Sequence, residues 1–107
     1  MNTAVQVTMY LNESDQWHHK PLHAEILRFL RNENVAGASA FHAVAGFNGP
    51  NPVHTSSLVD AGGNLPVVLI FVDFEEHISR VLPRLREMAP HRLIVRENVV
   101  IEQGNLE

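Results

Sequence analysis

A short motif, Gly46-Phe47-Asn48, is the first candidate for ligand binding in this sequence. Glycine lets a chain turn so that backbone N–H groups face an anion or the edge of an adenine ring. His54-Thr55 follows in the same polar segment, where the imidazole can bond a ligand or order the segment. Arg92 supplies a guanidinium that can bind phosphate through two hydrogen bonds. These residues indicate a small anionic ligand, and each also fits a plain turn or an exposed charge.

The seven histidines of the chain suggest metal binding as a second function. His19 and His23 are four residues apart and share a helical face if the helix starts early, and His18 adjoins them. Such a pair can hold zinc, copper or nickel. Pro21 lies between the two, however, and no His-Glu-x-x-His pattern occurs. A metal-binding protein that uses surface histidines is therefore the alternative hypothesis.

Patterns typical of catalysis are absent from the sequence. The chain has no cysteine, which excludes disulfides, thiolate nucleophiles and cysteine-based zinc sites. It has no Gly-x-Ser-x-Gly elbow and no Walker A or Rossmann glycine pattern. Ser56-Ser57 is typical of a loop, and a Ser-His-Asp set cannot be assembled from the spacing. We therefore expect a protein that is not an enzyme and that has no catalytic residues.

Length and charge limit the classes of partner. A chain of 107 residues supports one domain with one modest core, here residues 1–107. The net charge of -4 argues against nucleic-acid binding and against binding to anionic membranes. No secretory signal is visible at the N-terminus, and the longest apolar run, residues 65–72, is too short to span a bilayer. We expect a cytoplasmic protein.

The elements that must position these residues follow from hydrophobic periodicity. Residues 5–11 alternate between apolar and polar types, which predicts a strand with one face on a core. Residues 12–15 are turn formers, and a helix is predicted from about 21 to 34. Residues 38–45 form the second predicted strand.

A long segment at about 48–64, rich in Gly, Pro, Asn and Ser, separates the two halves of the chain. Loops of this length inside small domains are usually functional. The unbroken apolar run at 67–72 then predicts a central strand that is buried on both faces.

The C-terminal part begins with Asp73, which we expect to cap a helix. The apolar stripe of this helix is Ile78, Val81, Leu82, Leu85 and Met88. Pro83 within the stripe predicts a kink or a short helix, and Pro90 ends the helix. A last strand at 93–101 is expected to be bulged near Glu97-Asn98.

The element order is β-α-β-β-α-β. It predicts an α+β, ferredoxin-like sandwich: an antiparallel sheet with two helices on one face. The other face of the sheet would be partly apolar and uncovered. Such a face marks an interaction surface, and we expect a homo-oligomer.

The assembled motifs resemble the PII-like signal transduction proteins of the GlnB-like superfamily, in particular a branch long catalogued as a domain of unknown function. The resemblance covers nearly the whole chain, in the order of the family. Its matching residues are Trp17-His18-His19-Lys20-Pro21-Leu22, Val35-Ala36-Gly37-Ala38, Ala45-Gly46-Phe47, His54-Thr55, Leu65-Pro66-Val67-Val68 and Val72-Asp73.

The resemblance implies a homotrimer whose sheets line the inside and whose helices face solvent. It implies an adenine nucleotide (AMP, ADP, ATP or a cyclic nucleotide) bound between subunits. It also implies a partner, such as a membrane transporter or channel, that is regulated through the long loop. The histidine alternative would resemble the copper-tolerance relatives of the same architecture.

Two departures from the better-known PII pattern affect the ligand site that this resemblance implies. The Val-x-Gly-Phe-Gly motif of PII proteins reads Val44-Ala45-Gly46-Phe47-Asn48 here, and Asn tolerates the left-handed backbone region. The Gly-Asp-Gly-Lys phosphate loop reads Ala89-Pro90-His91-Arg92, so only the cation remains. The predicted ligand-binding residues are Gly46, Phe47, Asn48, His54, Thr55 and Arg92.

Overall fold

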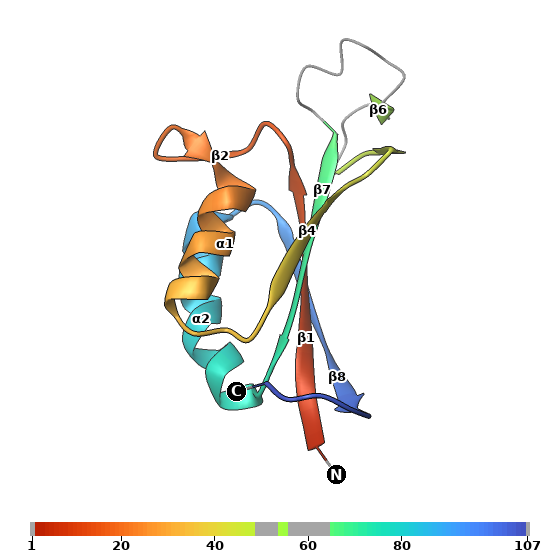
Figure 1. The fold of residues 1–107 in the computed structure, drawn as a ribbon. Coiled ribbons are helices and arrows are strands. Elements are labelled where there is room, and N and C mark those ends of the chain that lie inside the picture. Colours follow the sequence, from red (N-terminus) through yellow and green to blue (C-terminus); the bar gives the residue numbers. More distant parts are fainter. Residues whose placement is uncertain (1, 49–53, 56–64, 107) are drawn as a thin grey trace.

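The protein folds as a four-stranded antiparallel sheet with two helices on one face (Figure 1). The structure is a computed structural model that describes residues 2–48, 54–55 and 65–106. The strand order is β4-β7-β1-β8. The sheet strands are β1 (Asn2–Asn12), β4 (Ala38–His42), β7 (Pro66–Asp73) and β8 (Leu93–Ile101). With helices α1 (Leu22–Asn32) and α2 (Glu75–Met88), the main elements confirm the predicted β-α-β-β-α-β order.

The core lies between the sheet and the two helices. Alternation in β1 directs every second side chain toward the helices, and β7 does the same beside it. Each helix buries one apolar stripe against this face of the sheet. The largest fully buried side chains are Phe71, Met9, Leu11, Ile26, Leu30, Leu69, Ile78, Leu85, Val7, Val67 and Val81.

A small hairpin that we did not predict precedes α1. It consists of β2 (Gln16–Trp17) and β3 (Lys20–Pro21), joined by His18 and His19, whose φ angles are 51° and 67°. Two consecutive positive φ angles form the hairpin turn that matches strand twist, although glycine or asparagine usually fills it. The hairpin delays the start of α1 to Leu22.

Three further expectations are corrected by the C-terminal half. The β8 strand pairs with β1 without interruption from Leu93 to Ile101, so the bulge near residues 97–98 is absent from this strand. Helix α2 continues through Pro83 for 14 residues, so the short helix is wrong. The N-cap of α2 is Phe74, and Asp73 instead accepts a hydrogen bond from the Phe74 amide (2.7 Å), while its other oxygen lies 2.8 Å from His77 Nδ1.

No element among the described residues covers the sheet face opposite the helices (Figure 1). The central position of β7 is confirmed, but its side chains on this face are only half-buried. Cross-strand pairing aligns one row across all four strands: Phe41, Val68, Tyr10 and Leu93. The next row is Ser39, Ile70, Thr8 and Val95. Phe41, Leu93 and Val95 are 55%, 61% and 41% exposed, so a largely apolar surface faces outward.

Neither helix in the described part of the chain has the length and apolar character needed to cross a membrane.

Candidate functional site

The predicted site begins at a two-residue ladder beyond the end of β4. Strand β5 (Ala45–Gly46) pairs with β6 (His54–Thr55), so that Gly46 lies opposite His54 and Ala45 opposite Thr55. Three of the predicted residues are thereby brought together through their backbones. The remaining residues of the predicted 48–64 loop, 49–53 and 56–64, lie outside the described residues.

The backbone conformation at position 46 requires glycine. Its φ of +151° is a conformation that side-chain-bearing residues rarely adopt, and an added Cβ would lie 3.2 Å from Pro66 Cγ. The chain therefore reaches the base of the loop in a conformation that glycine alone adopts without strain. Phe47 follows with 58% of its surface exposed, which leaves its ring accessible to a flat ligand.

Asn48 fastens the base of the loop to the end of β1. Its Nδ2 donates to the Leu11 carbonyl at 2.7 Å and to Asn12 Oδ1 at 3.0 Å. Where PII proteins have glycine, this chain thus has a side chain that makes two specific contacts. The position of the loop base relative to the sheet is set partly by this amide.

Arg92 lies between the end of α2 and the start of β8, and its guanidinium is engaged by Asp15. Nε contacts Oδ2 and Nη2 contacts Oδ1, both at 2.7 Å, which is a bidentate ion pair. The side chains are 24% and 15% exposed, so the pair is well shielded from water. Arg92 is therefore not a free surface charge, which was the simpler alternative.

Asn12 connects these two predicted residues. The two ends of its side-chain amide lie 3.0 Å from Asn48 Nδ2 and 2.9 Å from Arg92 Nη2, and because both are donors, the one amide oxygen accepts from either Asn48 or Arg92. Its backbone N–H donates to Asp15 Oδ2 at 2.9 Å, and its carbonyl accepts from the Asp15 amide at 3.0 Å. We call these four residues, Asn12, Asp15, Asn48 and Arg92, the Asn48–Arg92 network.

Sequence reasoning missed Asn12 and Asp15 as members of a site. Both lie in the segment 12–15, whose composition predicted a turn. The turn is real, since the Asp15 amide bonds the Asn12 carbonyl. The sequence contains no signal for the contact with Arg92, which is 77 residues away from Asp15.

A pocket of about 250 Å³ opens beside Arg92. Its apolar part includes the start of α1 and the end of α2, and its polar part includes Gln16, His91 and both members of the Asp15–Arg92 pair. The lining residues are Asp15, Gln16, Leu22, Met88, Ala89, Pro90, His91 and Arg92. The sequence 89–92, which replaces the glycine-rich phosphate loop, therefore forms one wall of a cavity.

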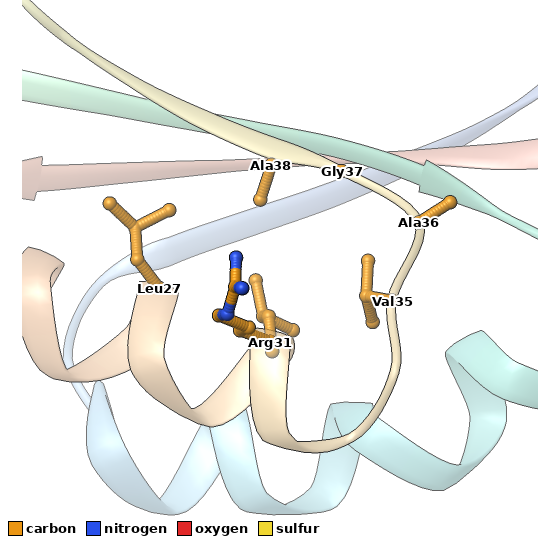
Figure 2. A pocket seen from close by; sticks show the side chains of 7 residues that line it. Leu27, Arg31, Val35, Ala36, Gly37 and Ala38 are labelled. Atoms are coloured by element: carbon orange, nitrogen blue, oxygen red, sulfur yellow. The ribbon is translucent and has the colours of Figure 1, made fainter.

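A second pocket, of about 300 Å³, lies at the opposite end of β4 from Gly46. Figure 2 shows Leu27 and Arg31 projecting from α1 toward Ala38, and Val35 and Gly37 complete the wall along the α1–β4 connection. Apart from Arg31, the side chains that line this pocket are apolar. It belongs to the segment 35–38 that carried part of the family resemblance.

The histidines do not assemble as the metal hypothesis required. His19 lies in the hairpin turn outside α1, so it does not share a helical face with His23. The His23 ring instead meets the edge of His42, with 5.6 Å between ring centroids. Across the described residues, no group of three His, Asp or Glu side chains is placed to hold a metal ion.

Comparison with known structures identifies the class of fold. The CPII protein of Thiomonas intermedia K12, a nitrogen regulatory PII-like protein bound to ADP, AMP and bicarbonate, superposes with a TM-score of 0.70. The match covers 95% of this chain and 91% of CPII at 12% identity. The divalent ion tolerance protein CutA1 of Ehrlichia chaffeensis superposes with a TM-score of 0.61 over 98% of this chain and 87% of CutA1, also at 12% identity. The fold is therefore the ferredoxin-like fold of PII-like and CutA proteins.

Sequence comparison identifies the family. Residues 4–101 match DUF190, described as "Uncharacterized ACR, COG1993". The UPF0166 protein MJ1524 of Methanocaldococcus jannaschii is 34% identical over 80 residues, which is 75% of this chain and 73% of that protein. The chain belongs to the DUF190 family, and the predicted branch of the PII-like proteins is confirmed. The description of the family and the name of this relative state no enzymatic activity.

Proposed function

We propose that this protein is a homotrimeric regulator that binds an adenine nucleotide between its subunits. The observation that carries this proposal is the meeting of Asn48 and Arg92 at one Asn12 amide. A cation suited to phosphate thus lies against the residue that fastens the loop base. The fold shared with ADP- and AMP-bound CPII supports the choice of ligand class.

The described residues leave room for such a ligand at Arg92. Asp15 uses the Nε and Nη2 edge of the guanidinium, and Nη1 has no hydrogen-bond partner within the described parts of the chain. A phosphate can bind at Nη1 or take the place of the Asp15 carboxylate. The exposed Phe47 ring offers a stacking surface for adenine, and the backbone at Gly46 offers hydrogen-bonding groups for the rest of the ligand.

The uncovered sheet face supports the trimer. Its two rows expose the apolar side chains of Phe41, Leu93 and Val95, whose contact with water is unfavourable. Association of three copies through these faces buries the rows and brings the loop base of one subunit next to a neighbour. The ligand then contacts two subunits at once.

The output of the proposed regulator is a protein partner, such as a membrane transporter or channel. The segment 48–64 makes this contact in the proposal, as the resemblance to PII-like proteins implies. Binding of nucleotide changes the partner only if the ligand prefers one arrangement of the loop base, since a ligand with equal affinity for two states shifts neither.

Calorimetric titration with AMP, ADP, ATP and cyclic nucleotides at millimolar concentration tests the ligand. At least one of them is expected to bind. Arg92→Gln should weaken that binding by about tenfold or more, because charge-assisted hydrogen bonds contribute about 1.5–3 kcal/mol each. Arg80→Gln, which removes an exposed arginine from α2, is the matched control. Equal weakening by both changes, or no heat from any nucleotide, contradicts the proposed ligand.

A further inference from the structure

We propose that Asp15 is a built-in competitor of the ligand: its carboxylate occupies the anion position at Arg92, and an incoming phosphate group displaces it. This inference rests on the proposed function, because it assigns the regulation of the same site. It adds a residue that the sequence motifs do not contain. A ligand bound at Arg92 would thereby affect the hydrogen bonds of Asn48 at the base of the loop.

The Asp15 carboxylate is bound as a ligand anion would be. It accepts hydrogen bonds from Arg92 Nε and Nη2 and from the Asn12 backbone N–H, at 2.7, 2.7 and 2.9 Å. Three donors converging on two oxygens form an anion site, and phosphate presents the same acceptor geometry. In the free protein this site is therefore filled by the protein itself.

Release of Asp15 requires a movement of its side chain alone. The Asp15 carbonyl accepts from the Leu22 amide at 2.8 Å and its own amide donates to Asn12, so the backbone is fastened to the start of α1 and to the end of β1. The pocket of about 250 Å³ borders both Asp15 and Arg92. It offers space for the ligand group, or for the displaced carboxylate.

The contact with Asn12 transmits this exchange to Asn48. Arg92 Nη2 and Asn48 Nδ2 lie at opposite ends of the Asn12 amide, and because both are donors, the single Asn12 side-chain oxygen accepts from one of them at a time. Asp15 Oδ2 also holds the Asn12 backbone N–H. When a phosphate displaces Asp15, Asn12 loses this backbone contact, and the hydrogen bonding of its amide with Asn48 changes in consequence.

The test compares Asp15→Asn with Glu87→Gln. Each change removes one negative charge and one partner of an arginine ion pair, since Glu87 pairs with Arg84 on α2. Inorganic pyrophosphate and AMP are titrated into the full chain, with adenosine as a probe without phosphate. Side-chain amide resonances of Asn48 report the loop base by NMR.

Asp15→Asn is expected to raise the affinity for pyrophosphate and AMP by about tenfold, because a charged competitor of the phosphate is removed. Adenosine affinity stays unchanged, which a merely structural effect would not produce. Pyrophosphate is expected to shift the Asn48 amide resonances in the wild type. Glu87→Gln matches the wild type in every titration.

Lower phosphate affinity in Asp15→Asn overturns the proposal, because Asp15 would then be positioning Arg92 for the ligand. Affinity equal to that of Glu87→Gln overturns it as well, as do Asn48 resonances that ignore pyrophosphate. The outcome also separates this inference from the proposed function. Pyrophosphate binding that Asp15→Asn strengthens, without nucleotide binding by either protein, keeps the competitor and removes the nucleotide regulator. Nucleotide binding with equal affinity in both proteins supports the nucleotide regulator and rules out Asp15 as a competitor.

Discussion

At the scale of single residues, Gly46 sets the backbone conformation at the base of the predicted loop. Gly46→Ala places a side chain at a φ of +151° and a Cβ 3.2 Å from Pro66 Cγ. We expect a loss of roughly 1–3 kcal/mol in the free energy of unfolding, the usual cost of a residue forced into a sparsely populated backbone region. Urea denaturation measures it.

Gly37→Ala is the control for this change. Gly37 has no atom within 4 Å of an added Cβ and does not have the positive φ of Gly46. Its replacement should therefore leave stability nearly unchanged. Equal destabilisation by both variants would show that the backbone conformation of Gly46 is not the cause.

Sequence reasoning singled out two of the four residues of the Asn48–Arg92 network, and their role in ligand binding stays a prediction. Asn48 and Arg92 were singled out because a motif and a charge type drew attention to them. Asn12 and Asp15 were interpreted only as turn formers, because Asn and Asp in a short polar segment are typical of turns. A partner at 77 residues' separation is set by tertiary packing, and no periodicity encodes it.

At the scale of elements, a charged contact joins α2 to β8. Glu75, in the first turn of α2, accepts from Arg96 of β8 and from Ser79 Oγ. The hydrogen bond from Arg96 is the main cause that lowers the pKa of Glu75, and Ser79 adds to it. A carboxyl group whose pKa is lowered by folding stabilises the fold above its unfolded pKa, and this contribution disappears as the pH falls through the folded value.

Arg96→Gln should therefore raise the pKa of Glu75 toward its ordinary value of 4.5, as measured by NMR titration of the carboxyl group. Ser79→Ala should raise it less, because Ser79 is the smaller cause. A pKa that does not respond to Arg96→Gln would show that the ion pair is absent in solution. Acid unfolding of the wild type should then lack this contribution as well.

Pro83 is the other feature of α2 that invites a test. It is exposed within a helix that runs from Glu75 to Met88, where it offers no N–H to the preceding turn. Pro83→Ala should raise the free energy of unfolding by about 1–3 kcal/mol, because it restores a hydrogen bond and removes a ring clash. Thermal or urea denaturation measures the gain. Arg80→Ala, on the exposed side of the same helix, should have little effect, and a loss of stability in Pro83→Ala would contradict the reasoning.

The elements themselves were largely predictable. Alternation in residues 5–11, the apolar run at 67–72 and the stripe from Ile78 to Met88 each matched one element. The β2–β3 hairpin was missed because its turn uses two histidines at positive φ, without the glycine that marks such turns in sequence. The bulge near residues 97–98 was expected from polar residues, but pairing with β1 continues through them.

At the scale of the whole molecule, two valines of β8 distinguish the faces of the sheet. Val95 shares its row with Thr8 and Ile70 on the uncovered face, whereas Val100 lies opposite Thr3 on the other face. They are 41% and 52% exposed, so neither is part of the core of one chain. Val95→Asp should dissociate the proposed trimer into folded monomers, as measured by light scattering after gel filtration.

Val100→Asp should leave the oligomer intact, since its side chain does not reach the proposed interface. A wild type that is monomeric in dilute solution would contradict the trimer. So would a trimer that survives Val95→Asp. The fold class and an uncovered sheet face were predictable from the sequence, but which side chains share that face follows only from the register of the sheet.

The most direct test of the account is ADP binding by the wild type and by monomeric Val95→Asp, measured by calorimetry at equal chain concentrations. The account predicts one ADP per chain for the wild type and little binding by the monomer, because the site lies between subunits and Val95 is not one of its residues. Equal affinity in the two proteins, or a wild type that gives no heat with ADP, would contradict it.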